Sequence, residues 1–344
     1  MPNIMLTYRC NLKCSYCFAN EFVNRENIDI TEENFEKAVA FLTKDNFARI
    51  GLIGGEPTIH PKFKNILDSL INNHKVEQVT VYTNGLELDK YTNQLITPKI
   101  KLLINCNSPE IIGKSNYEEM IKNIDNLIFN HYMKDRINLG INLYSNDMNY
   151  DYIISLLKRY NMHRVRISLT VPDFSNYRCN SILKSFEERK DFLLSFLKKL
   201  TDENILPYYD CNKPPFCIWD EQEKKEVENI VGKFGNIDTN LVGNKSFCYP
   251  VIDILPDLRA VRCFGMSDFL KVNISDFNNV TELASFFLNE IDAFAYQVYK
   301  DEDCSSCKLR KTRQCTIGCI GFKEKEIKDI KDHISHINLK QSNV

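Results

Sequence analysis

Short runs of apolar, often β-branched residues alternate with longer stretches of helical period through the first two thirds of the chain. The short runs predict strands at residues 3–8, 49–53, 78–82, 101–105, 138–144 and 164–170. The longer stretches predict helices: ITEENFEKAVAFLTK, opening at Thr31, PKFKNILDSLINN, opening with Pro61, NYEEMIKNIDNLIFN and YDYIISLLKRY. Such βα repeats predict a parallel sheet, but their spacing does not distinguish a partial (β/α)6 barrel from a doubly wound sheet.

The βα rhythm weakens after residue 172. The loop PDFSNYRCN leads to a predicted helix near 184–200, and beyond PYYDCNKPPFC lies a region in which cysteines recur. The tail KEKEIKDIKDHISHINLK, from Lys323 onward, is charged and predicts a surface helix. We therefore expect a core domain over 1–205, a smaller cysteine-rich α+β domain over 206–325, and a surface helix or tail over 326–344.

Charge and cysteine content narrow the class of protein. A formal net charge of −2 argues against nucleic acid or an anionic membrane as a bulk electrostatic partner. No apolar run approaches the ~18 residues that cross a bilayer, and the N-terminus MPNIMLTYRC does not read as a signal peptide, so we expect a cytoplasmic protein. Its 13 cysteines should be reduced there, which favours metal binding over disulfides.

Three of these cysteines, Cys10, Cys14 and Cys17, follow directly on the first predicted strand in RCNLKCSYCF. They should lie at the carboxyl edge of the sheet, where α/β folds place their active sites. Three thiolates on a cubane iron–sulfur cluster leave one iron open to a small molecule. A closed zinc site needs a fourth Cys or His, and the next forty residues contain neither, although buried or zinc-bound cysteines are the alternative.

The spacing C-x-x-x-C-x-x-C, with Tyr16 before the last cysteine, resembles the signature of the radical S-adenosylmethionine (radical SAM) enzymes. The resemblance implies a [4Fe–4S] cluster on the three cysteines, with SAM chelating the fourth iron. It also implies reductive cleavage of SAM to methionine and a 5′-deoxyadenosyl radical, which abstracts hydrogen from the substrate.

Further motifs follow the next strands. Gly54, Gly55, Glu56 and Pro57 resemble the family's GGEP element, which contacts the SAM amino group, and two glycines permit close backbone approach to a ligand. Thr83-Asn84-Gly85 resembles its TNG element. The best matches to the family's ribose contacts are Asn105, Asn107 and Ser108, although relatives often carry Ser and an acidic residue there. Asn142, Arg166 and Ser168 either face the site or are solvated or internally paired.

A second block holds eight cysteines between residues 211 and 319. It resembles the SPASM or twitch extensions of the superfamily, which carry one or two auxiliary [4Fe–4S] clusters; in isolation its last four cysteines could also be a zinc ribbon. The resemblance matches Cys248 and Cys263 to the cysteines flanking a β-hairpin, and it matches the final run to Cys304, Cys307, Cys315 and Cys319. Two departures are Leu258 in place of the usual Gly and the lack of a cysteine after Cys319.

Counting ligands leaves two possibilities for Cys211 and Cys217. The six cysteines from 248 to 319 close one four-cysteine cluster and leave two over, whereas adding this pair gives enough for two closed clusters. Alternatively, the pair lies in the substrate channel, with one thiol donating a proton or hydrogen. Cys106 and Cys179 stand alone and are interpreted as packing residues.

Auxiliary clusters favour an oxidative reaction, because in relatives they accept an electron from the substrate radical. We expect a peptide substrate, a ribosomally made precursor, that gains a cross-link or another oxidative modification. The chain starts almost at its first strand, without the recognition domain of many such enzymes, so a small biosynthetic intermediate is the alternative. The electron donor would be a flavodoxin or ferredoxin, and no catalytic acid or base is assigned. A non-catalytic iron–sulfur or zinc redox sensor is the distant alternative.

Overall fold

The computed structural model describes most of the chain. It leaves out residues 18–22, 24–27, 171–181, 210, 212–213, 215, 236–247, 268, 296–301, 313–318, 324–328, 330 and 333–344. Cys179 and Cys315 therefore lie outside the described residues, as does most of the predicted C-terminal tail. Where the chain is described, no helix is long and apolar enough to cross a membrane.

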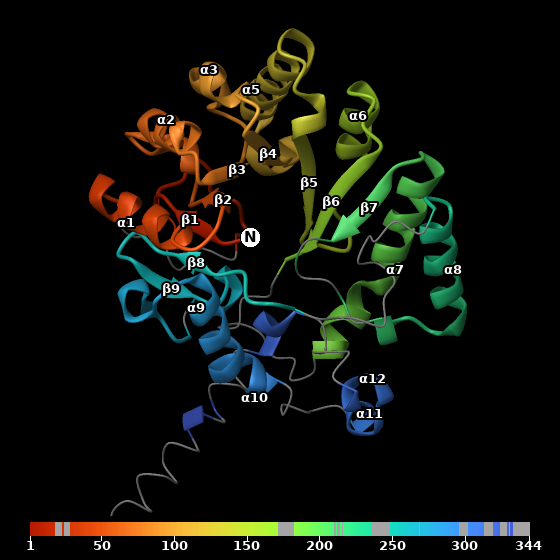
Figure 1. Ribbon diagram of the computed structural model, residues 1–344. Coiled ribbons are helices and arrows are strands. Elements are labelled where there is room, and N and C mark those ends of the chain that lie inside the picture. The colour runs from red at the N-terminus through yellow and green to blue at the C-terminus, as the bar shows by residue number, and fades with distance from the viewer. Residues whose placement is uncertain are drawn as a thin grey trace, which may run out of the picture.

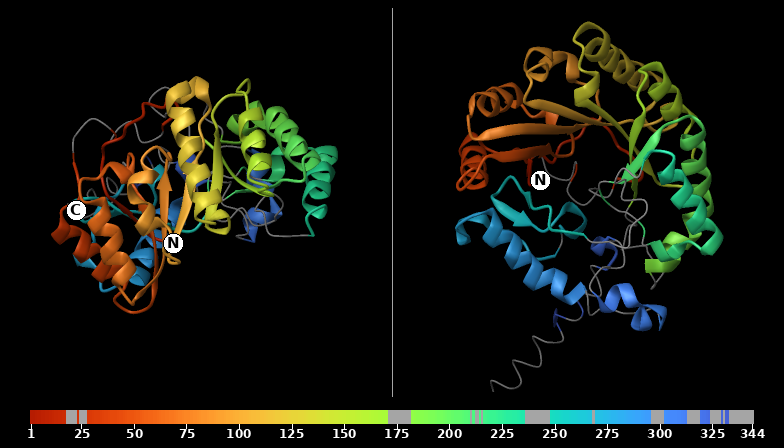
Figure 2. Two further views of the ribbon diagram at one scale, coloured as in Figure 1. Left: turned by 90° about the horizontal axis from the view of Figure 1, so that it is seen from above. Right: turned by 45° about the vertical axis from the view of Figure 1, so that its right-hand side comes forward.

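Seven parallel strands follow one another across the sheet in chain order. They are β1 (Asn3–Met5), β2 (Ala48–Ile53), β3 (Val76–Thr83), β4 (Ile100–Asn105), β5 (Ile137–Leu143), β6 (Arg164–Leu169) and β7 (Leu206–Tyr209). A doubly wound sheet reverses its strand order at a switch point, and these seven strands do not. The strands curve around a common centre with the helices outside them (Figures 1 and 2), which confirms the partial barrel.

Helices cover the outer face of the sheet. They are α1 (Glu32–Leu42), α2 (Phe63–Asn72), α3 (Thr92–Leu95), α4 (Pro109–Ile112), α5 (Lys114–Asp125), α6 (Asp151–Arg159), α7 (Ile182–Asp202) and α8 (Glu221–Gly232). Thr31 caps α1 by accepting a hydrogen bond from Asn34 N, whereas α2 begins two residues after Pro61. Alternate strand residues such as Val165 and Ile167 join the core beneath these helices, so Arg166 and Ser168 point to the inner face.

Strand β7 was not predicted, because its sequence LPYY runs into the proline-rich segment PYYDCNKPPFC. Among the described strands it pairs only with β6. Proline is tolerated in an edge strand of this kind, since one side of the strand needs no ladder hydrogen bond.

The C-terminal part of the chain extends the same sheet. A hairpin of β8 (Asp253–Ile254) and β9 (Arg259–Val261), followed by β10 (Val272–Asn273), adds to the free edge of β1, where Asn3 lies opposite Asp253. Met5, Tyr8, Leu255 and Val261 form a small apolar cluster at this junction. The helices that follow are α9 (Val280–Phe287), α10 (Ala293–Ala295), α11 (Glu302–Ser306) and α12 (Lys308–Lys311). The division at residue 205 stays a prediction.

Candidate functional site

Loops from the first three strands meet at the carboxyl edge of the sheet. Gly55 N donates to Thr7 O and Glu56 N donates to Arg9 O, both over 2.8 Å, so the GGEP loop runs alongside the chain that leads into the cysteine loop. On the next strand, Asn84 Nδ2 donates to Asn11 Oδ1 over 2.7 Å. The cysteine, GGEP and TNG motifs are therefore brought together by direct hydrogen bonds.

Both GGEP glycines are required by the close approach of these loops. A Cβ atom on Gly55 would lie 2.3 Å from Arg9 O, and one on Gly54 would lie 2.8 Å from Thr7 O. The sequence predicted close backbone approach to a ligand. The contact seen here is instead an approach of one stretch of the chain's own backbone to another.

Glu56 is buried and holds the second and third loops together. Its Oε1 accepts hydrogen bonds from Thr58 N, Thr58 Oγ1 and Thr83 Oγ1, and its Oε2 accepts one from Asn84 N over 2.7 Å. Burial raises the pKa of this carboxyl, and the four donors oppose that effect. The donor set favours the carboxylate, because every partner donates.

The three N-terminal thiols are partly buried in one loop. Burial raises the pKa of Cys10 to about 12, while burial, followed by the nearby Cys17, raises that of Cys14 to about 11. Leu12 N donates to Cys10 Sγ over 3.4 Å, an amide-to-sulfur bond of the kind that stabilises bound thiolates. Buried thiols release their protons on binding a cation, so this donor set fits an iron–sulfur cluster.

His60 is the nearest histidine in sequence to this loop and is not a free metal ligand. Its Nδ1 accepts from Lys62 N over 3.2 Å, and its Nε2 lies 3.1 Å from Ile30 O. Both ring nitrogens are thus used by the backbone.

An aromatic pair adjoins the cysteine loop. The ring of Tyr16 stacks on that of Tyr144, with centroids 4.8 Å apart and planes 6° apart. Tyr16 OH donates to Asn107 Oδ1, and Asn107 Nδ2 lies 3.9 Å from Cys14 Sγ. Asn107 therefore contacts both Tyr16 and Cys14, and all three are predicted site residues.

Other predicted residues lie along the next strands. Ser108 is buried at the start of α4, and the Oδ1 of Asn105 is buried with no partner among the described residues. Arg166 Nη1 donates to Asn142 Oδ1 over 2.8 Å, so these two side chains are internally paired. Cys106 belongs to the core, as its interpretation as a packing residue requires.

Four of the C-terminal cysteines form a second cluster of thiols. A hydrogen bond with Cys211 and then burial raise the pKa of Cys319, and the charges of Cys248 and Cys263 add to this. These four residues are therefore close to one another, whereas Cys217 is exposed on the turn Phe216–Ile218.

The other described cysteines of the second block are adjacent to each other. Cys307 N donates to Cys304 O over 3.3 Å. Across the described part of the chain, no three Cys, His, Asp or Glu side chains are grouped so that they could hold one metal ion. A zinc ribbon needs its ligands around one ion, whereas a cubane spaces its thiolates more widely because each binds a different iron.

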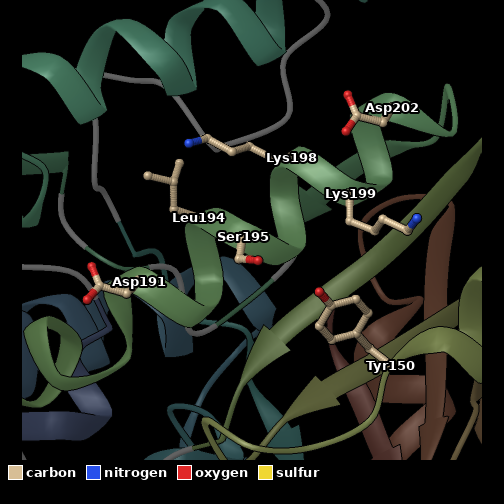
Figure 3. A pocket seen from close by; sticks show the side chains of 7 residues that line it. All are labelled: Tyr150, Asp191, Leu194, Ser195, Lys198, Lys199 and Asp202. Atoms are coloured by element: carbon tan, nitrogen blue, oxygen red, sulfur yellow. The ribbon is translucent and has the colours of Figure 1, made fainter.

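A surface hollow of about 420 Å³ lies along α7 and beside Tyr150, the residue before α6 (Figure 3). It is lined by Tyr150, Asp191, Leu194, Ser195, Lys198, Lys199 and Asp202. It includes none of the predicted site residues.

The family model of the Radical SAM superfamily matches residues 4–206, which is more than half of the chain. The chain belongs to the Radical SAM superfamily. This is a family of enzymes that bind a [4Fe–4S] cluster and SAM, so the predicted family, fold, enzyme class and these two cofactors are confirmed. The roles of individual residues stay predictions.

Curated relatives match less than half of the chain, whereas solved structures match nearly all of it. GTP 3′,8-cyclase of Haemophilus influenzae is 25% identical over 165 residues, covering 45% of this chain and 49% of that protein. Human molybdenum cofactor biosynthesis protein 1 is 29% identical over 145 residues, covering 39% of this chain and 23% of that protein. This chain thus spans at most about half the length of these curated relatives.

Two solved structures share the fold over 93% of this chain. Native anSMEcpe with bound AdoMet has a TM-score of 0.66 at 17% identity and is covered over 88% of its length. Streptococcus suis SuiB bound to S-adenosylmethionine has a TM-score of 0.59 at 15% identity and is covered over 72%.

Several residues that organise these sites were not identified from the sequence. Among them are Asn11, Thr58, Asn123, Arg262 and Asp292. Asn123 Nδ2 donates to Gly85 O over 3.0 Å and so supports the TNG loop from α5. Of the five, only Asn11 and Arg262 carried a usable signal, since one lies inside the cysteine motif and the other directly precedes Cys263.

Proposed function

We propose that this protein is a radical SAM oxidoreductase that removes hydrogen from its substrate and uses C-terminal auxiliary clusters to take up the remaining electron. The observation that carries this is the joining of the GGEP loop to Thr7 and Arg9, which lead directly into the Cys10–Cys17 loop, by two backbone hydrogen bonds. When bound on Cys10, Cys14 and Cys17, a [4Fe–4S] cluster with SAM supplies a 5′-deoxyadenosyl radical.

The chain's own residues orient and enclose these groups. The stacked Tyr16 and Tyr144 offer an aromatic surface beside the cluster loop, suited to packing against adenine. The buried Oδ1 of Asn105 has no partner among the described residues, and a buried acceptor of this kind suits a ribose hydroxyl. Glu56 keeps the GGEP and TNG loops in register, with Gly54, Gly55 and Pro57 shaping the turn.

The second cysteine block would hold the auxiliary clusters. Cys211, Cys248, Cys263 and Cys319 supply four thiolates for one closed cluster, which the mutual influence of these thiols supports. Cys304 and Cys307, with Cys315 outside the described residues, would hold a second. Cys217 is then either its fourth ligand or a thiol in the substrate channel.

We favour a peptide substrate. The fold is shared with SuiB, whose structure bound to precursor peptide SuiA is known, and with anSMEcpe, which has been seen with the Cp18Cys peptide. A small molecule is the second candidate, because the curated relatives include GTP 3′,8-cyclase. A flavodoxin or ferredoxin would deliver the first electron, and a cytosolic location would keep the thiols reduced.

Anaerobic reconstitution tests the proposed chemistry. The iron-loaded protein is mixed with SAM and a low-potential reductant, and 5′-deoxyadenosine is measured by chromatography. We expect about 12 iron atoms per chain if all three cubanes form, about 8 for two and about 4 for one. If no 5′-deoxyadenosine forms in an intact, fully iron-loaded sample, the radical enzyme proposal fails.

Two cysteine variants separate the roles of the two blocks. Cys14→Ala should abolish SAM cleavage, because it removes a ligand of the SAM-binding cluster. Cys304→Ala should lose about four iron atoms and keep most of the cleavage measured without substrate. Cys106→Ala is the matched control and should keep all the iron, since Cys106 is a packing residue. A folded Cys14→Ala variant that still cleaves SAM would contradict the ligand assignment.

The class of substrate is tested by measuring 5′-deoxyadenosine again, now in the presence of candidate substrates. GTP and, separately, any short peptide found to be encoded beside this gene are added to the loaded enzyme. A peptide that stimulates 5′-deoxyadenosine formation and loses mass by two hydrogens supports the favoured reading. Stimulation by GTP alone would instead support the small-molecule candidate.

A further inference from the structure

A buried arginine lies against the sulfurs of the second cysteine block. The Arg262 side chain has no exposed surface, and it follows β9 directly, one residue before Cys263. Its Nη1 lies 3.5 Å from Cys248 Sγ and 3.7 Å from Cys263 Sγ. One guanidinium nitrogen thus faces two proposed ligands of the same auxiliary cluster.

A carboxylate fixes the orientation of this guanidinium. Asp292 is 2% exposed and receives two hydrogen bonds, from Arg262 Nε over 2.8 Å and from Arg262 Nη2 over 2.6 Å. Nη2 also donates to Cys248 O over 2.7 Å. Asp292 ends the π-helical segment Leu288–Asp292, which continues α9 into α10, and α9 lies beside the β8–β9 hairpin in Figure 1. The planar fork of arginine matches this two-point arrangement, which lysine does not reproduce.

We propose that Arg262, held in place by Asp292, is a positioning residue that raises the reduction potential of the auxiliary cluster bound by Cys211, Cys248, Cys263 and Cys319. This rests on the proposed function, because it takes these cysteines as cluster ligands.

The direction follows from charge. Reduction adds one electron to the cluster and forms or breaks no covalent bond, so the reduced state carries one more negative charge. A buried cation and N–H donors at the sulfurs stabilise that state more than the oxidised one. Asp292 opposes part of this effect but lies on the far side of the guanidinium from the sulfurs that Nη1 faces. A higher potential makes the cluster a better acceptor for an electron from a substrate radical.

The test uses full-length protein in which Cys10, Cys14 and Cys17 are replaced by Ala, so that only auxiliary clusters remain. Reductive titration with dithionite is followed by electron paramagnetic resonance. Arg262→Met is combined with Asp292→Leu, which avoids leaving one buried charge alone. We expect at least a tenfold decrease in the equilibrium constant for one-electron reduction, equivalent to 59 mV. Asp292→Asn alone should shift the potential the other way, because the cation then lacks its counter-charge.

Arg259→Met is the matched control, because Arg259 lies three residues earlier, is exposed and pairs with the exposed Asp257. It should leave the potential unchanged. The inference is overturned if the double variant and Asp292→Asn both keep their iron and both have the reduction potential of the parent. It is also overturned if both variants shift the potential in the same direction. Should the double variant lose its iron, Asp292→Asn decides: a raised potential supports the inference, and any other result overturns it.

The cluster assignment itself is checked separately with Cys248→Ala in the same background. Loss of about four iron atoms supports the ligand set. Full retention of iron and signal would refute the ligand set, whatever the arginine variants do.

Discussion

Gly55→Ala should separate the GGEP loop from the cysteine loop. The new Cβ would lie 2.3 Å from Arg9 O, 2.6 Å from Arg9 C and 3.1 Å from Cys10 Cβ. Two of these atoms are backbone, so no side-chain rotation relieves the overlap. One of the two loops must move, and the movement is transmitted directly to Cys10, the first proposed cluster ligand.

The cost can be estimated from the contacts at the junction. Moving the loops apart weakens the bonds from Gly55 N to Thr7 O and from Glu56 N to Arg9 O, each 2.8 Å long. Each is worth about 1 kcal/mol, and the residual overlap adds about 1–3 kcal/mol. We expect a loss of about 3–5 kcal/mol in the free energy of unfolding. A domain of ordinary stability survives this, but with its cysteine loop displaced.

The assay is urea unfolding of the apoprotein together with iron content after anaerobic reconstitution. Gly232→Ala is the control, because a Cβ there meets nothing within 4 Å and the residue ends α8. It should keep both properties, whereas Gly55→Ala should lose stability and about four iron atoms. If the free energy of unfolding of Gly55→Ala lies within about 1 kcal/mol of that of the parent, and the iron content is the same, the close contact does not constrain the loop.

Two further predictions concern buried carboxyl groups. Glu56→Ala should lower the free energy of unfolding by about 2–4 kcal/mol, because the donors on Thr58 and Asn84 lose their acceptor; urea unfolding measures this, and a loss below about 1 kcal/mol would contradict it. Burial raises the pKa of Asp253 to about 6 from an ordinary value of 3.8, so the folded state holds its proton more tightly. The parent should therefore lose about 2–3 kcal/mol of stability as the pH rises from about 4 to about 7, and Asp253→Asn should not show this loss. Thermal unfolding across this pH range is the measurement, and parallel pH profiles would refute the shift.

Which motifs meet could be predicted from the sequence, because parallel strands bring their carboxyl ends to one edge. That rule alone places the residues after β1, β2 and β3 together, and the hydrogen bonds of Gly55, Glu56 and Asn84 are its result. The identity of each contact was less accessible. Whether a glycine approaches a ligand or another backbone depends on loop paths, which residue type does not specify.

Long-range polar partners were the main omission. Asp292 lies 30 residues beyond Arg262, in a segment whose local pattern says only that it is helical. Its pairing depends on how α9 and α10 return to the hairpin, which no local period encodes. Strand β7 was missed for the opposite reason, since the local signal of Pro207 opposed a strand that its edge position permits.

The continuous sheet has a consequence for electron transfer between the two proposed cluster sites. Strand β1 leads into the cysteine loop and pairs with β8 on the edge opposite β2. At this edge Asn3 Nδ2 also donates to Asp253 Oδ1 over 2.6 Å. Strand β9, paired with β8, leads to Arg262 and Cys263. The strands that lead to the two proposed sites, β1 and β9, thus belong to one sheet and are separated by the single strand β8. If both clusters are bound as proposed, the sheet sets the separation between them and with it the distance over which an electron would pass.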